Sequence, residues 1–353
     1  MTFSKLRKSV LFFSSLVHGG GRTFAETYAE SMPDAEITLC TLYDKAFTKK
    51  LAERLGLRAC SIFNPRLILD PRTLVFSNSQ ACAAIAALLY PGRHYYVTHG
   101  YANGLPYARQ WRRNIWAAQV NIPGTKIIAC GDTEQDAISA LLLRKTKVSL
   151  IRNGLPQKVI QGAVSTMEVE SRTVKSVHLA YVGRVSFQKG LDLLLRALEQ
   201  PALRQREIKL SIIGNYQERE EQYCAEVREL IQRSPATIEM IPPQQIDVTF
   251  FRRFFALVAP SRFEGLPYTI LEAAYAGIPI VLSDCPGNCD IAPNDRYAFT
   301  FKTEDEASLV HALLRLIDSN ADEINDRVTL MRQRVISEFS SSSFRDEYLK
   351  LLR

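Results

Sequence analysis

Two glutamates, Glu264 and Glu272, lie eight positions apart in a segment whose residue types could bind a polar anionic ligand. Glu264 falls in a loop after an expected strand, Pro267 opens an expected helix, and Glu272 lies inside that helix. The free amides of such a helix start can hold an anion, and the carboxylates can accept hydrogen bonds from sugar and ribose hydroxyls. The segment therefore suits a nucleoside diphosphate joined to a sugar. A capping acid and a solvated helix residue would give the same spacing.

A second segment adds two cations to this hypothesis. Residues 180–184 end an expected strand at Arg184, and Lys189 stands just before the helix expected at residues 191–198. A diphosphate needs cationic donors at such a strand-to-helix turn. An isolated Arg and Lys at a turn are more often surface residues, but together with the two-glutamate helix in the same half they are candidate ligands.

The elements that must position these residues follow from the hydrophobic pattern. Short apolar runs alternate with helix-length patterns, which predicts parallel sheets with right-handed crossovers. The expected strands are residues 8–17, 35–42, 73–77, 93–98, 126–130 and 147–151, then 177–182, 209–213, 237–240, 257–259 and 279–282. Residues 161–175 are polar and turn-prone, which places a linker there. The expected fold class is α/β, with two doubly wound halves whose facing sheets would form a ligand cleft.

Length and composition agree with this organisation. The chain has 353 residues, 46% hydrophobic and 23% charged, which fits about two domains and excludes a small module or a disordered chain. The longest apolar run, residues 81–90, is far shorter than a membrane span, so we expect a soluble or peripheral protein.

The net excess of positive charge lies entirely in the first half of the chain. Residues 1–160 contain 21 Lys and Arg against 10 Asp and Glu, a balance of +11, whereas the remainder contains 23 against 27, or −4. This asymmetry predicts that the first half meets phosphates or an acidic membrane surface. A solvated basic face is the alternative.

The cysteines and the N-terminus point to the cytoplasm. Seven scattered cysteines, an odd number, predict reduced core thiols, and the C-x3-C spacing of Cys285 and Cys289 lacks a second ligand pair for zinc. The apolar run of residues 10–13 could imitate a secretory signal, but it leads into Gly19, Gly20 and Gly21 without a cleavage site. A buried first strand that feeds a glycine loop explains these residues better.

Taken together, the segments resemble the retaining family 4 glycosyltransferases, which have the two-domain GT-B fold. The resemblance rests on the Glu264 to Glu272 segment, the Gly-Arg turn with Lys189, residues 149–155, residues 213–215 and the initial glycines, and it spans nearly the whole chain. It implies an acceptor-binding domain at residues 1–165, a donor-binding domain at residues 166–335 and a terminal helix at residues 336–353 that crosses back to the first domain. Each large domain would be Rossmann-like, and the two would face each other across the cleft.

The resemblance also implies roles for individual residues. Arg184 and Lys189 would bind the donor diphosphate, Glu272 would bind the ribose, and Glu264 would face the transferred sugar. The other expected donor-binding residues are Gly19, Gly20, Gly21, Gly183, Gly214, Asn215, Ile241, Gly265, Leu266 and Tyr268. The sequence departs from the family at Asp290, where a Glu is usual, and lacks a glycine at residues 296–299, which leaves the sugar undetermined.

Two histidines of the first half are further candidates. His99 ends an expected strand where the family often has a histidine near the donor sugar and acceptor, and it could orient a hydroxyl or stabilise developing charge. A structural histidine is the alternative. His18, beside the glycine loop, is a weaker candidate for the acceptor region.

A helix expected at residues 107–118 carries the strongest signal for an acceptor or membrane surface. At about 100° per residue, one face is assigned to the core and carries Tyr107, Trp111, Ile115 and Ala118. The opposite face carries Arg109, Arg112, Arg113 and Trp116. Three cations around an exposed Trp suit an anionic membrane surface or a lipid-diphosphate acceptor. Packing of Trp116 against a neighbouring loop is the alternative.

The expected activity is metal-independent, retaining transfer of a sugar from a nucleotide-diphosphate sugar to a glycan or lipid-linked acceptor. The resemblance suggests bacterial surface polysaccharide or lipopolysaccharide synthesis, in the cytoplasm or on the inner face of the plasma membrane. No Asp-x-Asp motif occurs, so we expect no metal and no cofactor besides the donor substrate. A nucleotide-sugar epimerase and a catalytically silent sugar-nucleotide-binding subunit are the alternatives. No recognisable nucleic-acid motif accompanies the basic charge, so no nucleic-acid partner is expected.

Overall fold

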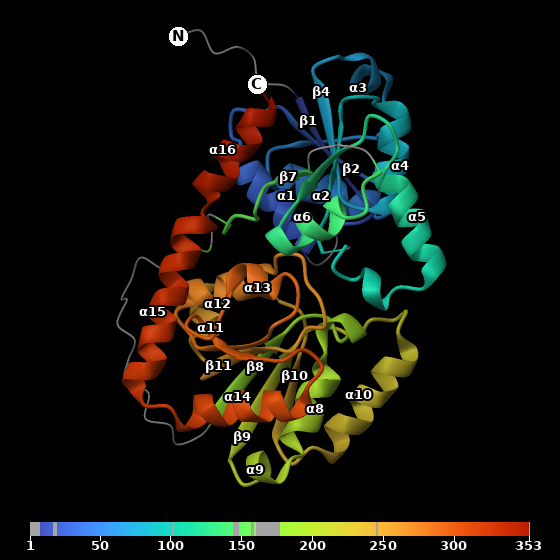
Figure 1. Cartoon of the computed structure of the whole chain (residues 1–353). Coiled ribbons are helices and arrows are strands. Elements are labelled where there is room, and N and C mark those ends of the chain that lie inside the picture. Colours follow the sequence, from blue (N-terminus) through green and yellow to red (C-terminus); the bar gives the residue numbers. More distant parts are fainter. Residues whose placement is uncertain are drawn as a thin grey trace. The chain divides into compact units, whose positions relative to one another are not determined.

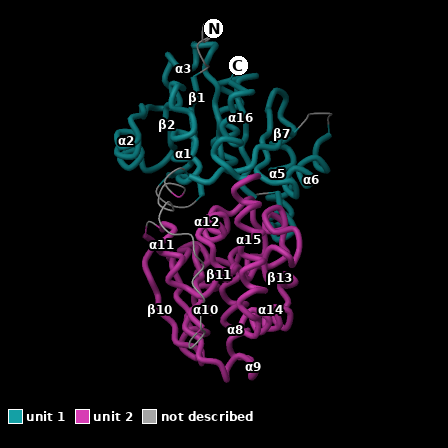
Figure 2. The backbone as a smooth tube through the Cα atoms, turned by 90° about the vertical axis from the view of Figure 1, so that its left-hand side faces the viewer, with its two compact units in different colours: residues 1–157, 339–353 teal, residues 158–338 magenta. Residues whose placement is uncertain are grey.

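The computed structural model describes residues 8–16, 20–100, 102–143, 148–156, 159, 177–244 and 246–352. The chain divides into two compact units, residues 1–157 with 339–353 and residues 158–338, which Figure 2 colours separately. The linker expected at residues 161–175 lies outside the described residues. Each unit has its own parallel sheet and its own hydrophobic core.

Unit 1 is built on a parallel sheet in the order β3-β2-β1-β4-β5-β6-β7. The strands are β1 (Lys8–Phe13), β2 (Ile37–Thr41), β3 (Arg58–Ala59), β4 (Thr73–Ser77), β5 (His94–Val97), β6 (Lys126–Ala129) and β7 (Val148–Leu150). The strand order reverses between β1 and β4, which pair with Lys8 opposite Thr73 and Phe12 opposite Ser77. β1 is apolar and buried from Val10 onward because helices cover both faces of such a sheet.

The helices of unit 1 connect these strands and flank the sheet (Figure 1). They are α1 (Gly20–Ser31), α2 (Lys45–Arg54), α3 (Pro65–Leu69), α4 (Gln80–Leu89), the 3-10 turn η1 (Leu105–Tyr107), α5 (Gln110–Val120), α6 (Asp132–Ser139) and α16 (Ser341–Leu352). Local sequence sets several starts: the Asn64 and Ser79 side chains cap α3 and α4 by accepting backbone N–H bonds.

The C-terminal helix α16 belongs to unit 1 and lies beside α1. Its Tyr348 ring packs edge-on against Tyr28 of α1 and Phe76 of β4, with centroids 5.0 and 5.5 Å apart. Gly154 permits this docking because a Cβ there would lie 2.8 Å from the Phe344 Cβ. The helix therefore completes the core on one face of the first sheet.

Unit 2 is built on a parallel sheet in the order β10-β9-β8-β11-β12-β13. The strands are β8 (Val177–Val182), β9 (Ile208–Ile213), β10 (Thr237–Ile241), β11 (Ala256–Ala259), β12 (Ile280–Ser283) and β13 (Phe299–Phe301). β8 lies between β9 and β11, so the strand order reverses between β8 and β11. In open α/β sheets, ligands bind beyond the carboxyl ends of the strands at such a reversal.

The helices of unit 2 follow the same logic. They are η2 (Phe187–Lys189), α8 (Leu191–Leu198), α9 (Pro201–Arg204), α10 (Glu221–Arg233), α11 (Val248–Phe251), α12 (Tyr268–Ala276), α13 (Asn288–Ile291), α14 (Glu306–Asp318) and α15 (Ala321–Glu338). In α8 the buried residues Leu191, Leu194, Leu195 and Leu198 have helical spacing and face the core. Asp305 caps α14 by accepting the Ser308 N–H at 2.9 Å.

Every strand expected from the sequence overlaps an observed strand, and the predicted α/β class with two doubly wound sheets is confirmed. β3 and β13, with two and three residues, have no expected counterpart. Among the helices within the described residues, none is both long enough and apolar enough to cross a bilayer.

Candidate functional site

Two loops meet at the point where the strand order of unit 2 reverses. The first follows β8 and contains Gly183, Arg184 and the η2 turn, and the second follows β11 and leads from Pro260 to α12. Arg262 N–H donates to the Gln188 carbonyl at 2.8 Å, which joins the loops backbone to backbone. The sequence-predicted cations and Glu264 therefore lie at one edge of one sheet.

Glycines set how closely the backbone segments approach. Gly190 has a left-handed φ of 64°, and a Cβ there would lie 2.0 Å from the Pro260 carbonyl oxygen. A Cβ on Gly214 would lie 1.9 Å from the Gly183 carbonyl oxygen. Only glycine fits at these two places, so the backbones of both loops and of the turn after β9 are in contact.

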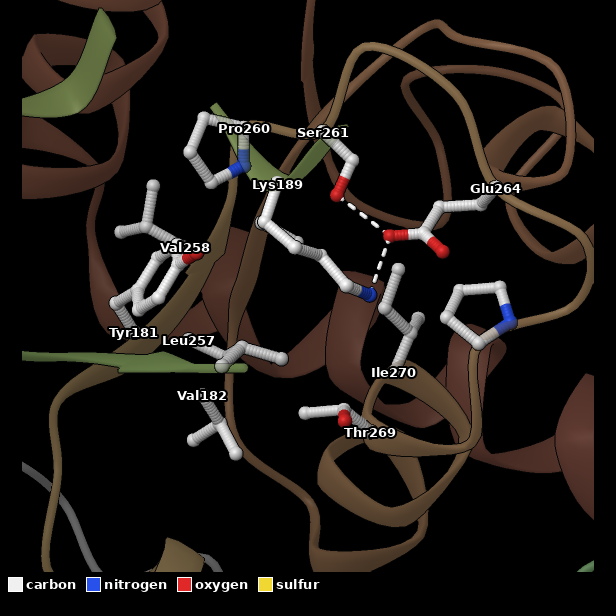
Figure 3. Close-up of a pocket in the computed structure, with 12 residues that line it drawn as sticks. Tyr181, Val182, Lys189, Leu257, Val258, Pro260, Ser261, Glu264, Thr269 and Ile270 are labelled. Carbon is white, nitrogen blue, oxygen red and sulfur yellow. Dashed lines mark hydrogen bonds and ion pairs between the residues drawn. The ribbon is translucent and has the colours of Figure 1, made fainter. Parts of the chain in front are cut away.

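Lys189 and Glu264 form an ion pair at the centre of this edge. The Lys189 Nζ donates to Glu264 Oε1 at 2.6 Å, and the Ser261 Oγ donates to the same oxygen at 2.6 Å, as Figure 3 shows. Gln188 Nε2 donates to the other carboxylate oxygen at 3.4 Å. Glu264 is only 5% exposed, so its charge is balanced by a cation and by short hydrogen bonds.

A small pocket adjoins this ion pair. Its volume is about 10 Å³, and its lining includes Tyr181, Val258 and Ile270. That is room for about one water molecule. The pocket itself is therefore too small for a nucleotide, and a larger ligand would have to contact the loops from their outer side.

Arg262 organises the two loops and was not singled out by the sequence analysis. Its guanidinium donates to both carboxylate oxygens of Asp192, at 2.9 and 2.8 Å, and to the Phe187 carbonyl at 2.7 Å. It also donates to Glu304 at 3.0 Å. Burial raises the pKa of Asp192, but the Arg262 hydrogen bonds and charge outweigh it and leave the pKa lowered. Arg262 thus ties the turn that carries Lys189 to its own loop.

The structure places the other donor-site candidates around the same edge. Arg184 is exposed, and its guanidinium donates to Gln188 Oε1 at 3.4 Å. Gly214 N–H donates to the Ile241 carbonyl at 3.0 Å, next to the exposed Asn215. Arg184 follows β8, Gly214 and Asn215 follow β9, and Ile241 is the last residue of β10. These three strands are neighbours in the sheet, so the expected phosphate and base contacts share one strand edge.

The start of α12 completes this edge. Its N-cap residue is Pro267, which offers the first amides no side-chain cap, while Leu266 and Tyr268 on either side are buried. A Cβ on Gly287 would lie 2.5 Å from the carbonyl oxygens of Glu264 and Gly265, so the loop after β12 supports this turn closely. Glu272 lies half-buried one turn farther along α12. The N-terminus of α12 gives the edge partial positive charge through the helix dipole.

In unit 1, His99 lies in the loop two residues after β5 and packs edge-on against Phe24, with ring centroids 5.2 Å apart. Its Nδ1 lies 3.5 Å from the Cys130 Sγ, and its Nε2 has no hydrogen-bond partner within the described residues. Burial lowers the pKa of His99 to about 4, so the ring is neutral near pH 7. This protonation state favours a hydrogen-bonding role over stabilisation of negative charge.

The glycine loop of unit 1 is described only in part. Gly20 and Gly21 form the first residues of α1, and a Cβ on Gly20 would point into open space, with no contact within 4 Å. A Cβ on Gly21 would lie 2.8 Å from Asn78 Nδ2, beyond the end of β4. His18 and Gly19 lie outside the described residues.

The expected faces of the helix near residue 110 are wrong. Trp116 is fully buried and its Nε1 donates to the Tyr96 hydroxyl at 3.4 Å, whereas Trp111 and Ile115 are 55% and 53% exposed. The reason is that α5 is buried at its C-terminal end, through Trp116, Gln119 and Val120, and exposed along its first half. Burial therefore follows the length of the helix rather than one side of it. Arg109, Arg112 and Arg113 are exposed as expected.

The described residues contain no group of three or more His, Cys, Asp or Glu side chains placed to hold a metal ion. All seven cysteines are free thiols.

Comparison with known proteins identifies the second unit. Residues 176–319 match the family model described as glycosyl transferases group 1. The chain is 29% identical over 180 residues to the glycogen synthase of Thermus thermophilus, and this match covers 49% of the chain and 39% of that enzyme. Over 83 residues it is 31% identical to an Escherichia coli UDP-Gal:alpha-D-GlcNAc-diphosphoundecaprenol alpha-1,3-galactosyltransferase, covering 24% of the chain and 21% of that enzyme. The matched segments thus span well under two thirds of these curated relatives.

The similarity to solved structures extends over both units. The crystal structure of Anabaena Alr3699/HepE in complex with UDP-glucose superposes with a TM-score of 0.79 at 16% sequence identity, covering 98% of this chain and 99% of that one. This likeness establishes the GT-B fold, and the expected resemblance is confirmed. Residues 176–319 thus match the glycosyl transferases group 1 family, and the GT-B fold extends over both units.

Proposed function

We propose that this protein is a retaining glycosyltransferase that moves a sugar from a nucleotide-diphosphate sugar to a glycan or lipid-linked acceptor. The observation that carries the proposal is the set of Arg184, Lys189 and Glu264 at the strand reversal of unit 2, where α/β sheets bind ligands. The family relationship supports the same assignment.

In this proposal the donor diphosphate lies at the carboxyl edge of unit 2. The exposed guanidinium of Arg184 and the ammonium of Lys189 donate to phosphate oxygens, and the N-terminus of α12 adds partial positive charge through the helix dipole. Glu272 binds the ribose, and the residues after β9 and β10 contact the base. Because these groups supply the positive charge, the transfer needs no metal ion or further cofactor.

Glu264 has a specific place in this scheme. In the described structure Lys189 neutralises its buried carboxylate, and donor phosphate would compete for the same ammonium. When Lys189 turns to the phosphate, Glu264 keeps its hydrogen bonds from Ser261 and Gln188, and its carboxylate can also accept from a sugar hydroxyl. The pair thus links occupation of the phosphate site to orientation of the transferred sugar.

The proposed reaction proceeds on one face of the sugar. The bond from the anomeric carbon to the phosphate oxygen breaks with its electron pair going to that oxygen, the acceptor hydroxyl oxygen bonds to the carbon, and its proton passes to the leaving phosphate. Arg184 and Lys189 stabilise the charge that develops there, so loss of the Arg184 guanidinium should cost on the order of 2–4 kcal/mol in the transition state. The neutral His99 would orient a hydroxyl group.

The acceptor side of the proposal rests on the basic first half and on a relative. The Escherichia coli relative is named for a diphosphoundecaprenol acceptor, a lipid-linked diphosphate. An acceptor of that class would suit the arginines of α5 and an enzyme on the inner face of the plasma membrane, in surface polysaccharide or lipopolysaccharide synthesis.

The test is thermal stabilisation of the full chain by UDP, GDP, CDP and ADP and by their sugar conjugates, in EDTA. A ligand at ~100 times its dissociation constant stabilises the fold by roughly 2.7 kcal/mol. We expect one base to shift the transition, and Glu272→Ala to abolish the shift. No shift with any nucleotide would overturn the proposal, and turnover of a sugar nucleotide without acceptor would favour an epimerase.

A further inference from the structure

The first half of α5 is exposed on all sides although it carries large apolar side chains. Residues 109–115 form an unbroken exposed run, within which Trp111 and Ile115 lie one helical turn apart. The 40%-exposed Tyr107 precedes the helix in η1. Isolated exposed apolar residues are common, but here a Trp and an Ile on adjacent turns form one contiguous apolar patch.

The helix orders these side chains around its axis. At about 100° per residue, Trp111 and Ile115 form an apolar edge, and the guanidinium groups of Arg112, Arg109 and Arg113 follow in that order on the adjoining side. The Arg112 guanidinium lies over the Trp111 ring, 5.2 Å from its centroid. The remaining side is polar and uncharged.

The surrounding sequence contains no acidic residue that could neutralise these arginines. Residues 71–131 include six Lys or Arg and no Asp or Glu. None of the three arginines forms an ion pair with another described residue. Their charge is therefore available to an anionic partner from outside the chain.

The other end of α5 makes this patch rigid. Trp116 is buried in the core of unit 1, and Gln119 Nε2 donates to the Gln80 carbonyl of α4 at 2.6 Å. Asn121, which ends the helix, accepts the Leu143 N–H at 2.8 Å. The exposed half thus projects from a fixed base as a preformed helix, so little ordering entropy opposes its binding.

We propose that Tyr107, Arg109, Trp111, Arg112, Arg113 and Ile115, here called the α5 face, dock the protein on an anionic lipid bilayer. Trp and Tyr prefer the bilayer interface, Ile inserts among the acyl chains, and Arg binds lipid phosphates. One short helix gives reversible rather than permanent attachment. The biological use of this surface rests on the proposed function, because a lipid-linked acceptor must be met at the membrane, but the binding itself requires neither donor nor acceptor.

The experiment is co-sedimentation of the full chain with two kinds of vesicle. One is pure phosphatidylcholine, and the other is an equal mixture of phosphatidylcholine and phosphatidylglycerol. We expect binding to the anionic vesicles only, weakened by salt. Removal of all three arginines by Arg109→Gln, Arg112→Gln and Arg113→Gln should lower the partition coefficient about 100-fold. The double variant Trp111→Ser, Ile115→Ser should also lower the partition coefficient strongly.

Matched controls separate the α5 face from general charge and hydrophobicity. Lys49→Gln, Lys50→Gln and Arg66→Gln remove three exposed cations from α2 and α3, and Leu69→Ser removes an exposed apolar side chain from α3. We expect these controls to bind within about threefold of the parent. Equal losses in the controls, or equal binding to neutral vesicles, would overturn the proposal.

Tryptophan emission gives a second, local readout. The chain has two tryptophans, and Trp116 is buried while Trp111 is exposed. Emission should shift to the blue on addition of anionic vesicles, and Trp111→Phe should abolish the shift while retaining most of the binding. A shift that persists in Trp111→Phe, or nucleic acid that displaces the protein from vesicles, would contradict the assignment.

Failure of this inference is distinguishable from failure of the proposed function. Each α5 variant is also tested with the nucleotide panel, where its thermal shift should equal that of the parent because the face lies outside unit 2. Nucleotide binding without vesicle binding would refute only the docking face. Vesicle binding without nucleotide binding would refute only the transferase.

Discussion

Replacing Lys189 by Met should destabilise unit 2 through the carboxylate that it leaves behind. The Lys189–Glu264 distance is 2.6 Å, with 19% and 6% of the two side chains exposed. Removing one partner of a fully buried pair costs about 3–5 kcal/mol. Here Lys189 is partly exposed, and Glu264 keeps its hydrogen bonds from Ser261 and Gln188, so we expect about 2 kcal/mol.

The same reasoning predicts partial repair by a second substitution. Glu264→Gln removes the charge that Lys189 balances, so Lys189→Met should cost about 1–2 kcal/mol less in the Glu264→Gln background. The assay is urea unfolding of the two single variants, the double variant and the parent, followed by circular dichroism. In thermal unfolding of the same proteins, a loss of about 2 kcal/mol should lower the Tm of a domain of this size by about 4–8 °C.

Tryptophan fluorescence supplies an internal control for this cycle. Both tryptophans lie in unit 1, whereas Lys189 and Glu264 lie in unit 2. The variants should therefore change the dichroism transition more than the fluorescence transition. Additive single effects, within about 0.5 kcal/mol, would refute the claim that Lys189 neutralises Glu264.

Three further predictions concern backbone, proton and thiol chemistry. Gly190→Ala should destabilise the protein and abolish nucleotide binding, because its Cβ meets the Pro260 carbonyl of the opposing loop. The control Gly56→Ala has a φ of 68° and open space around the new Cβ, so it should cost only the backbone strain of about 1–2 kcal/mol. Urea unfolding measures the stability of both variants, and thermal shift measures their nucleotide binding. Burial raises the pKa of Glu134 to about 7, above the pKa of the same group in the unfolded chain, so the protonated carboxyl stabilises the fold at low pH and this stabilisation is lost as pH rises through 7. The free energy of unfolding of Glu134→Gln should therefore rise by about 1–3 kcal/mol relative to that of the parent between pH 5 and pH 8. A difference that does not change with pH would contradict this prediction. A hydrogen bond with the Cys40 thiol lowers the pKa of Cys60 to about 7, whereas burial raises the pKa of Cys289. Mass spectrometry should therefore find Cys60 alkylated by iodoacetamide well before Cys289 at pH 7.5. Equal alkylation rates would contradict the lowered pKa of Cys60.

The sequence pattern predicted the sheets well because parallel strands are continuous apolar runs. β8 at Val177–Val182 and β4 at Thr73–Ser77 occupy the residues expected of them. Once the strands are placed, the loops at their carboxyl ends must share an edge, which is why Lys189 and Glu264, 75 positions apart in the chain, could be assigned to one site.

Arg262 shows what local patterns miss. It lies inside the segment that was recognised for its glutamates, yet its bidentate partner Asp192 is 70 positions away in α8. A second charged residue, two positions before Glu264 in the same loop, was the available signal. The partner follows only from the tertiary contact between this loop and the first turn of α8.

The α5 helix shows a different limit. Its amphipathic pattern was interpreted as one buried and one exposed side, but the helix is buried at one end and exposed at the other. Trp116 shares an azimuth with the exposed arginines and is nevertheless in the core. Angular periodicity carries no information about how far a helix projects beyond the body that it packs on.

The central claim is that the carboxyl edge of the second sheet holds a donor diphosphate. Isothermal titration calorimetry of the selected nucleoside diphosphate, in EDTA, against the parent, Arg184→Ala and Arg204→Ala tests it most directly. Arg204 is an exposed arginine of the same unit in α9, before β9 and thus at the opposite edge of the sheet. The account predicts that Arg184→Ala raises the Kd about 10- to 100-fold and Arg204→Ala less than twofold. Equal affinities for all three proteins would contradict it.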